Sequence, residues 1–305
     1  AHRRDYNADH DPQRMKPAPH ITLAGREVGE GRPVYIICEA GVTNYGEIAL
    51  ARRQLEAAVN AKCDAVKYQA WKTENLVSKK VSARLESELG YNWFDRIKYK
   101  ELADDELRQL RDEAAGNGMT FFATPHDTWA VDFLDRELNI PFFKVGSGES
   151  NNPEFLRAVG GRGKPVLISL GIKTDEEILE AVSILRESGT REIGVFHCVS
   201  QYPTEPGNAN LARIAHLRDL LGLPIGISDH TRGFHVPLAA VALGACMVEK
   251  HLTFDKTDPR SVDNAGALLP EELTAMTAQI RDLEAALHPL TEEQRLASVA
   301  KGREW

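Results

Sequence analysis

Short, almost continuously hydrophobic segments alternate with longer amphipathic segments along most of the chain. Eight of the short segments have the length and composition of β-strands: residues 34–41, 64–69, 120–125, 142–148, 165–171, 193–200, 224–229 and 246–253. Hydrophobic residues at successive positions, instead of alternate ones, are typical of strands that are buried on both faces of a parallel sheet. The pattern therefore indicates eight buried parallel strands.

Segments with helical periodicity lie between these strands, among them residues 47–61, 104–117, 175–188 and 270–287. Thr174 lies three residues before Glu177, a spacing that fits a helix capping box. Eight regular βα units predict an α/β protein with one (β/α)8 TIM barrel over residues 31–288. An open, doubly wound sheet is the alternative, but no Gly-x-Gly-x-x-Gly motif opens its first helix.

Three segments fall outside this repeat. Residues 1–30 are polar at their start and are predicted to form a flexible arm, and residues 289–305 a linker-like tail. The connection 70–102 is much longer than its counterparts and rich in aromatic residues. Loops of this length are usually functional, so we expect it either to cover the site or to seal the barrel rim.

Composition excludes several classes of protein. The 305 residues carry a formal net charge of −8, which disfavours nucleic acid as a partner. No apolar run reaches the ~20 residues of a membrane span, and no secretory signal precedes the first strand. The four cysteines form no Cys-x-x-Cys pair, so we expect reduced thiols in a cytoplasmic protein: Cys38, Cys63, Cys198 and Cys246.

Polar residues gather where the predicted strands end, which is where barrel enzymes carry their chemistry. Lys67 and Lys144 are hard to explain by packing, because a buried charge is costly unless it is paired or faces a polar cavity. With nearby hydroxyl groups these lysines would bind a dianionic phosphate: Thr124, Ser147, Ser169 and Ser228. A structural ion pair between each lysine and a neighbouring glutamate stays open as the alternative.

His230 and His251 end the seventh and eighth predicted strands, so their imidazoles could share a divalent metal. The alternative is that both histidines hydrogen-bond to Asp229 and Glu249. His197 is as consistent with a structural histidine as with a functional one. The first strand has no His-x-His pair, and Gly-x-Ser-x-Gly and P-loop motifs are absent, which disfavours metallohydrolase, acyl-enzyme and nucleotide chemistry.

Seven ordered segments resemble the sialic-acid synthase family, whose members condense phosphoenolpyruvate with an N-acylated hexosamine to give a nonulosonic acid and phosphate. They are CEAGVTNYG, DAVKYQ, FFATPHD, FKVGSGE, HCVSQYPT, GISDHTRG and VEKHLTFD, between residues 34 and 287. The resemblance implies a barrel, a divalent cation (Mn²⁺ or Mg²⁺), phosphoenolpyruvate and a sugar acceptor as substrates, and a homodimer.

The resemblance also implies roles for individual residues. The metal ligands would be His230 and His251, and the catalytic groups Glu149, Glu39 and Lys67. Phosphoenolpyruvate would be held by Lys67, Thr124, Lys144, Ser147, Ser169, Ser200 and Ser228. The acceptor would face Gln69, Tyr202 and Asp263.

The sequence departs from the family pattern on the acceptor side. Thr43-Asn44 replaces Asn-His, residues 261–264 replace Gly-Pro-Asp-His, and Ser169-Leu170-Gly171 replaces Ser-Thr-Gly. Family members usually continue into an antifreeze-like domain, whereas this sequence ends at Trp305, so we expect an acceptor pocket without that wall.

Two other functions are therefore kept open. The first is a synthase of 2-keto-3-deoxy acids that uses a sugar phosphate, for which Arg96, Arg232 and Arg260 could bind the acceptor's phosphate. The second is a catalytically silent barrel that binds a metabolite of the pathway.

Overall fold

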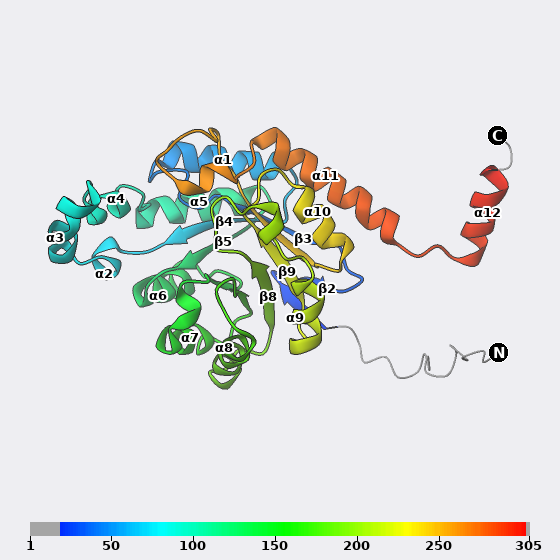
Figure 1. The fold of residues 1–305 in the computed structure, drawn as a ribbon, viewed down its shortest axis with the longest axis horizontal. Coiled ribbons are helices and arrows are strands. Elements are labelled where there is room, and N and C mark those ends of the chain that lie inside the picture. The colour runs from blue at the N-terminus through cyan, green and yellow to red at the C-terminus, as the bar shows by residue number, and fades with distance from the viewer. Residues whose placement is uncertain (1–18, 303–305) are drawn as a thin grey trace.

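A nearly closed barrel of eight parallel strands forms the centre of the structure, a computed structural model that describes residues 19–302 (Figure 1). The strands are β3 (Tyr35–Glu39), β4 (Ala65–Ala70), β5 (Thr120–Pro125), β6 (Phe143–Val145), β7 (Val166–Ser169), β8 (Ile193–Cys198), β9 (Ile225–Asp229) and β10 (Met247–His251). Their hydrogen-bonded order is β5-β4-β3-β10-β9-β8-β7-β6, and β6 packs beside β5. Each of the eight predicted strands is present, and the predicted TIM-barrel fold is confirmed.

Eight helices alternate with the strands and cover the barrel. They are α1 (Ile48–Asn60), α5 (Asp104–Gly116), α6 (Thr128–Arg136), α7 (Pro153–Gly160), α8 (Asp175–Glu187), α9 (Arg213–Leu221), α10 (His235–Ala242) and α11 (Pro270–Leu287). The capping box at Thr174 is present, since Glu177 N–H donates to the Thr174 hydroxyl and the Glu177 carboxylate accepts from Thr174 N–H. The helices and the strands bury one continuous hydrophobic core.

A hairpin closes the end of the barrel at which the strands begin. It pairs β1 (His20–Leu23) with β2 (Arg26–Gly29) and buries Ile21, Leu23 and Val28. A Cβ added to Gly194, at the start of β8, would lie 2.9 Å from Ile21 Cδ1, so the Ile21 side chain reaches into the barrel interior. The sequence predicted a flexible arm over residues 1–30, but part of that segment forms this hairpin in the structure. The reason is that alternate apolar residues of the hairpin are buried against the barrel. Residues 1–18 of that arm lie outside the described residues.

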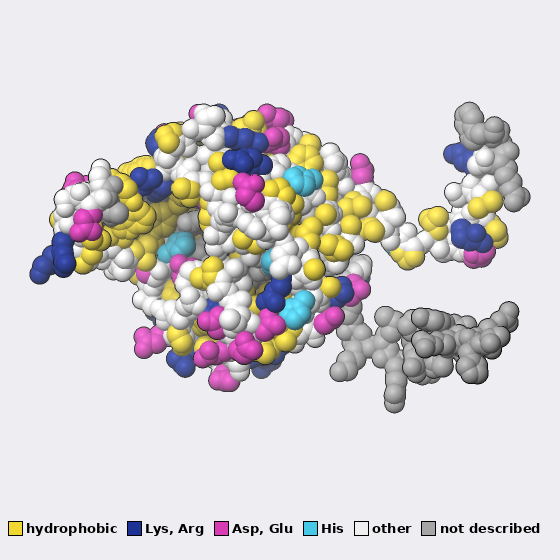
Figure 2. Space-filling view, in the orientation of Figure 1, with side chains coloured by type: hydrophobic (Ala, Val, Ile, Leu, Met, Phe, Trp, Pro, Cys, Tyr) yellow, Lys and Arg dark blue, Asp and Glu magenta, His cyan; other side chains and the backbone are white. Residues whose placement is uncertain are grey.

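The long connection after β4 folds into three short helices: α2 (Thr73–Leu76), α3 (Lys79–Leu89) and α4 (Trp93–Lys98). We call residues 71–102 the excursion; it projects from the side of the barrel (Figure 1). Trp71 and Phe94 are buried, whereas Trp93 and Tyr99 are exposed. Figure 2 shows hydrophobic side chains lining a hollow between the excursion and the barrel.

The segment predicted as a linker-like tail forms a helix over most of its length. This helix, α12 (Glu292–Gly302), is exposed throughout and lies away from the barrel in Figure 1. Residues 303–305 lie outside the described part of the chain. None of the helices in residues 19–302 has both the length and the apolar character needed to cross a membrane.

Candidate active site

Lys67 lies among carboxylates and a hydroxyl group at the carboxyl ends of four strands. Its Nζ is 3.2 Å from Glu39 Oε2 on β3 and 3.0 Å from Glu249 Oε2 on β10. It also donates to the Thr124 hydroxyl on β5, at 3.2 Å. The ion pairs with glutamate that the sequence left open are therefore present, and they bring Lys67, Glu39 and Thr124 together as predicted.

Lys144 approaches the same carboxylate from the other side of the barrel. Its Nζ donates to the Ser169 hydroxyl at 2.7 Å and lies 3.5 Å from Glu249 Oε1. Ser228 donates to that same oxygen, at 2.9 Å. All of these side chains are buried, so Glu249 joins the two predicted lysines and two predicted hydroxyl residues into one cluster.

The charges of this cluster leave room for an anion. Burial raises the pKa of Glu39 to about 7, although Lys67 opposes the shift. Burial also acts to raise the pKa of Glu249, but Lys144 and Lys67 outweigh it and hold that pKa well below its usual range. Near neutral pH the two lysines thus face one ionised carboxylate and one that is partly protonated. Two lysines facing less than two full negative charges favour a bound phosphate, although burial lowers the pKa of Lys144.

The two remaining predicted phosphate ligands lie beside Gly171, at the end of β7. The Ser147 hydroxyl accepts from Gly171 N–H at 3.0 Å and lies 3.1 Å from Cys198 Sγ. A Cβ added to Gly171 would meet Cys198 Sγ at 2.6 Å and Ser200 Oγ at 3.1 Å. Glycine is thus required at this close approach, and Ser200 itself is exposed.

A second group of side chains extends from Glu39 toward Glu149. Gln69 donates to Glu39 Oε1 at 3.0 Å, and its own Oε1 is 3.2 Å from His126 Nε2. His126 Nδ1 lies 2.7 Å from Glu149 Oε1. Burial acts to raise the pKa of Glu149, but the hydrogen bond and charge of His126 outweigh it and lower that pKa. Glu149 is therefore ionised at neutral pH, as a proton acceptor must be.

His230 and His251 lie side by side, with ring centroids 5.4 Å apart. Burial and the neighbouring His251 lower the pKa of His230 to about 4, and burial lowers that of His251. Both rings are thus in the neutral form that binds metals. His230 Nδ1 contacts the Val199 carbonyl, not Asp229, and the buried His251 Nδ1 has no hydrogen-bond partner.

Two available imidazoles fit a divalent cation that takes its other ligands from substrate and water. No group of three or more His, Cys, Asp or Glu side chains within residues 19–302 forms a ligand set. His197 is structural by contrast, because its Nε2 contacts the Ala209 carbonyl at 2.8 Å.

Two of the three predicted acceptor-facing residues lie beside the two histidines. The Tyr202 ring lies 4.2 Å from that of His230 and 6.4 Å from that of His251. Asp263 is half-buried, accepts from the Ser261 hydroxyl, and is close enough to act on the pKa of both His251 and Tyr202. Tyr202 and Asp263 therefore lie beside the two histidines, whereas Gln69 lies beside Glu39 and His126.

Residues that depart from the family pattern hold loops in place. Thr43 donates to the Leu252 carbonyl at 2.7 Å, and Asn44 donates to the Gly41 carbonyl at 3.0 Å. Asn264 bridges Tyr45 OH and the Thr253 hydroxyl, both at 2.7 Å. In this chain, the side chains at these positions form hydrogen bonds that hold the loops around the site together.

Two residues of the site, Glu249 and His126, were not predicted from the sequence to have a role there. Glu249 was considered only as a partner of a histidine, and His126 only as part of a motif. Glu249 lies two positions before His251 on β10, and alternate residues of a strand share a face. That periodicity could have placed Glu249 in the barrel interior beside the lysines.

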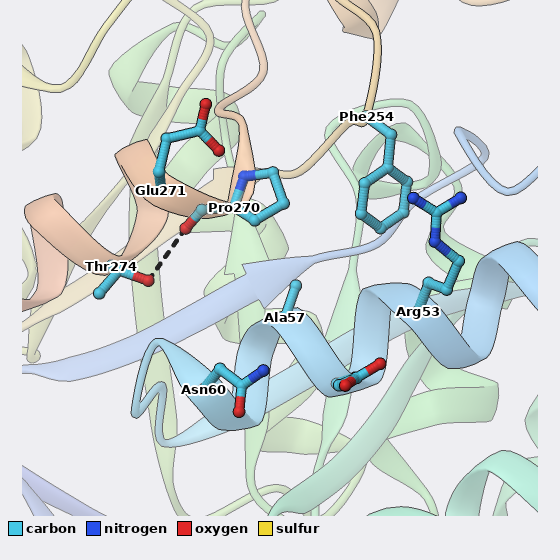
Figure 3. Close-up of a pocket in the computed structure, with 8 residues that line it drawn as sticks. Arg53, Ala57, Asn60, Phe254, Pro270, Glu271 and Thr274 are labelled. Carbon is cyan, nitrogen blue, oxygen red and sulfur yellow. Dashed lines mark hydrogen bonds between the residues drawn. The ribbon is translucent and has the colours of Figure 1, made fainter.

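A pocket of about 380 Å³ lies on the outer layer of helices, away from this cluster (Figure 3). Arg53 of α1 covers the Phe254 ring there at 4.1 Å, and Thr274 donates to the Pro270 carbonyl. None of the residues that line it belongs to the cluster described above.

Comparisons with known proteins agree with the barrel fold and identify the family. The sequence matches the NeuB family over residues 54–291. It is 36% identical to the N,N'-diacetyllegionaminic acid synthase of Campylobacter jejuni, over 83% of this chain and 77% of that protein. It is 34% identical to the N-acetylneuraminate-9-phosphate synthase of Homo sapiens, over 88% of this chain and 75% of that protein.

A solved structure is similar throughout. It is an N-acetylneuraminic acid synthetase from Leptospira borgpetersenii in complex with citrate, with a TM-score of 0.79 and 31% identity, covering 93% of this chain and 97% of that one. These relatives and the family match confirm the resemblance seen in the sequence. The chain belongs to the NeuB family.

Proposed function

We propose that this protein condenses phosphoenolpyruvate with the open-chain aldehyde of an N-acylated amino sugar, giving a nonulosonic acid and inorganic phosphate. The observation that carries the proposal is the buried cluster in which Lys67 and Lys144 share Glu249 and contact the hydroxyl groups of Thr124 and Ser169. Its position beside two neutral imidazoles and the ionised Glu149 supports a site for both substrates.

Phosphoenolpyruvate would bind with its phosphate at the two lysines. The hydroxyl groups of Ser169 and Thr124, which now contact those lysines, can turn to donate to phosphate oxygens. The Gly171 N–H and Ser147 hydroxyl lie beside them. This set offers charge-assisted hydrogen bonds, which are the strong ones for phosphate.

His230 and His251 would hold Mn²⁺ or Mg²⁺, and the bound cation would polarise the aldehyde oxygen of the acceptor. His251 Nδ1 is buried and without a partner, which fits a ligand role. Gln69, Tyr202 and Asp263 would orient the sugar around this point. We expect the reaction to be lost when the cation is removed.

The bond changes follow from this arrangement. C3 of phosphoenolpyruvate attacks the aldehyde carbon, whose oxygen takes a proton, and positive charge develops at C2. Water adds at C2 and loses a proton to Glu149, which is ionised at neutral pH. The C2–O bond to phosphate then breaks as the C2 hydroxyl gives up its proton to the departing phosphate, leaving a 2-keto acid and inorganic phosphate, and Glu149 returns its proton to solvent. Lys67 and Lys144 stabilise the charge on the departing phosphate.

A sugar phosphate is the second candidate acceptor, and one observation favours it. Arg96 and Arg260 line one open groove of about 680 Å³ between the excursion and the loop after β10. Arg260 is already paired with Asp258 at 2.7 Å, however, and Arg232 lies elsewhere with Glu205. The arginines that the sequence suggested therefore do not form one free cluster.

The test is release of inorganic phosphate from phosphoenolpyruvate with Mn²⁺. The panel of acceptors holds N-acetylmannosamine, mannose, diacetamido-trideoxyhexoses and hexose phosphates, each with and without chelator. Chelator-sensitive release with an unphosphorylated amino sugar is expected. Release with sugar phosphates alone would transfer the protein to the second candidate, and silence across the panel would favour the metabolite-binding barrel.

We further propose that the protein works as a homodimer in the cytoplasm. Four buried free cysteines support a reducing compartment. Sedimentation of the purified chain and its location in fractionated cells test the two statements separately.

A further inference from the structure

We propose that His126 is a positioning residue that joins the proton acceptor Glu149 to the acceptor-facing Gln69, so that one imidazole controls both catalysis and sugar orientation. The inference rests on the proposed function for its kinetic consequences. Its geometric basis is independent of any substrate.

The His126 ring uses both of its nitrogens on side chains of the site. Nδ1 is 2.7 Å from Glu149 Oε1, and Nε2 is 3.2 Å from Gln69 Oε1. Both neighbours are oxygen acceptors, so a ring carrying hydrogen on both nitrogens donates to both. Because Gln69 in turn donates to Glu39, the side chains form one hydrogen-bonded chain across the mouth of the barrel.

The surroundings leave Glu149 little choice of position. A Cβ added to Gly146 would lie 2.4 Å from Glu149 Oε2, so the carboxylate rests directly on the backbone at the end of β6. The indole of Trp71 contacts the His126 ring edge to face, with centroids 6.0 Å apart. Trp71 is buried and donates to the Thr73 hydroxyl, which fixes the ring that His126 leans against.

The two contacts predict two separable effects. The contact with Glu149 helps to keep that carboxylate ionised, and the charge of Lys144 on β6 acts in the same direction. The contact with Gln69 holds the Gln69 amide in one orientation, with Oε1 toward His126 and Nε2 toward Glu39. Loss of the first contact should alter proton transfer, and loss of the second should alter sugar binding.

Three variants of His126 separate these effects. The amide nitrogen of asparagine can replace Nδ1, that of glutamine can replace Nε2, and phenylalanine keeps a ring against Trp71 with neither nitrogen. The acceptor kinetics of each variant are measured across pH with phosphoenolpyruvate saturating. His288→Asn, at an exposed histidine on the opposite end of the barrel, is the matched control.

For His126→Phe we expect kcat/KM to fall on the order of 10- to 100-fold, because a displaced catalytic group is costly. Its acidic limb should move to higher pH, since the contact that lowers the pKa of Glu149 is gone. His126→Asn should keep the acidic limb of the pH profile at the pH of the wild type but raise KM for the sugar. His126→Gln should move the acidic limb to higher pH but leave KM for the sugar unchanged. Three variants with one common profile, or profiles equal to His288→Asn, would overturn the proposal.

A second measurement does not depend on turnover. In protein labelled with ¹⁵N-histidine, the His126 signals are identified by their absence from the His126→Asn spectrum. We expect Glu149→Gln to shift the Nδ1 resonance of His126 and Gln69→Ala to shift its Nε2 resonance. Unchanged resonances would refute the chain even if no acceptor is found, whereas shifts without any turnover would instead refute the proposed function.

Discussion

Glu249 occupies the position between the two lysines at which a bound anion would compete with it. It contacts Lys67 at 3.0 Å, Lys144 at 3.5 Å and the Ser228 hydroxyl at 2.9 Å, all inside the barrel. Breaking a buried ion pair from one side leaves an uncompensated charge, which is more costly than never having had the pair. The protein without substrate therefore depends on this carboxylate to hold its lysines.

Glu249→Gln should lower the free energy of unfolding by about 3 to 5 kcal/mol, because both lysines lose their strongest partner. Inorganic phosphate should restore part of that loss by binding to the same lysines. Urea unfolding with and without phosphate measures both effects. Glu293→Gln, at an exposed position of α12, is the control. A variant as stable as this control would contradict the central role of Glu249.

Glu39 should make stability depend on pH in a defined direction. Burial raises its pKa from 4.5 to about 7, so between these values the native state holds a proton that the unfolded chain has released. The contribution of Glu39 to the free energy of unfolding therefore falls as pH rises through this window. Glu39→Gln should remove that fall, which urea unfolding at both ends of the window detects. Parallel pH curves for wild type and variant would refute it.

The residues of the site were predictable to the extent that their strands were. Lys67, Lys144 and the two histidines stand out because polar groups interrupt hydrophobic runs. Glu249 was missed because its partners come from β4, β6 and β9, and nothing in the linear sequence displays the distances across a barrel. His126 was missed for the same reason, since its partners lie 57 and 23 positions away in the chain.

At the scale of elements, the loop after β3 and the end of the excursion are in close contact. Gly46 has a φ of +69°, and a Cβ there would lie 2.4 Å from the Tyr99 carbonyl oxygen. The Tyr99 hydroxyl in turn donates to the Arg260 carbonyl in the loop after β10. The excursion therefore contacts both the loop after β3 and the loop after β10.

Gly46→Ala should force the excursion away from the barrel and raise KM for the acceptor on the order of tenfold, because the sugar loses part of its enclosure. Binding of phosphoenolpyruvate, measured by calorimetry, should stay unchanged. Gly90→Ala is the matched control: its φ is +75°, but no atom lies within 4 Å of the added Cβ. If both substitutions raised KM equally, the cause would be backbone strain at a positive φ, and the proposed contact between Gly46 and Tyr99 would be contradicted.

The hairpin β1–β2 should contribute to stability without taking part in catalysis. Ile21→Ala removes most of a side chain that is 2% exposed, and should cost about 2 to 5 kcal/mol in thermal or urea unfolding. Turnover at low temperature should be unaffected, because the hairpin lies at the end of the barrel opposite the site. Thr22→Ala, on the exposed face of the same strand, should change neither quantity.

Prediction from the sequence succeeded for the repeated strand–helix units and failed for the hairpin that precedes them. The eight strands were visible because each is a buried run next to a helix-forming segment. The hairpin has two strands of four residues each, and only three of its side chains are fully apolar and buried: Ile21, Leu23 and Val28. So short an alternating pattern is indistinguishable from a polar arm until the surface that receives it is known.

At the scale of the whole molecule, the two ends of the barrel differ in character. The cluster of charged side chains lies at the carboxyl ends of the strands, while the hydrophobic hairpin covers the other end. The excursion and the loops after β3 and β10 surround the charged end. Substitutions can therefore accumulate in those loops without disturbing the strands that carry Lys67 and Lys144.

The seat of the hairpin has a consequence for the order of folding. A Cβ at Gly194 would touch Leu167, Ile21 and Met247, so β1, the first strand within the described residues, packs near residues that the ribosome adds much later. During synthesis the apolar side chains of the hairpin therefore stay exposed to solvent until β10 has left the ribosome. Contacts so distant in sequence slow folding and expose the nascent chain to aggregation.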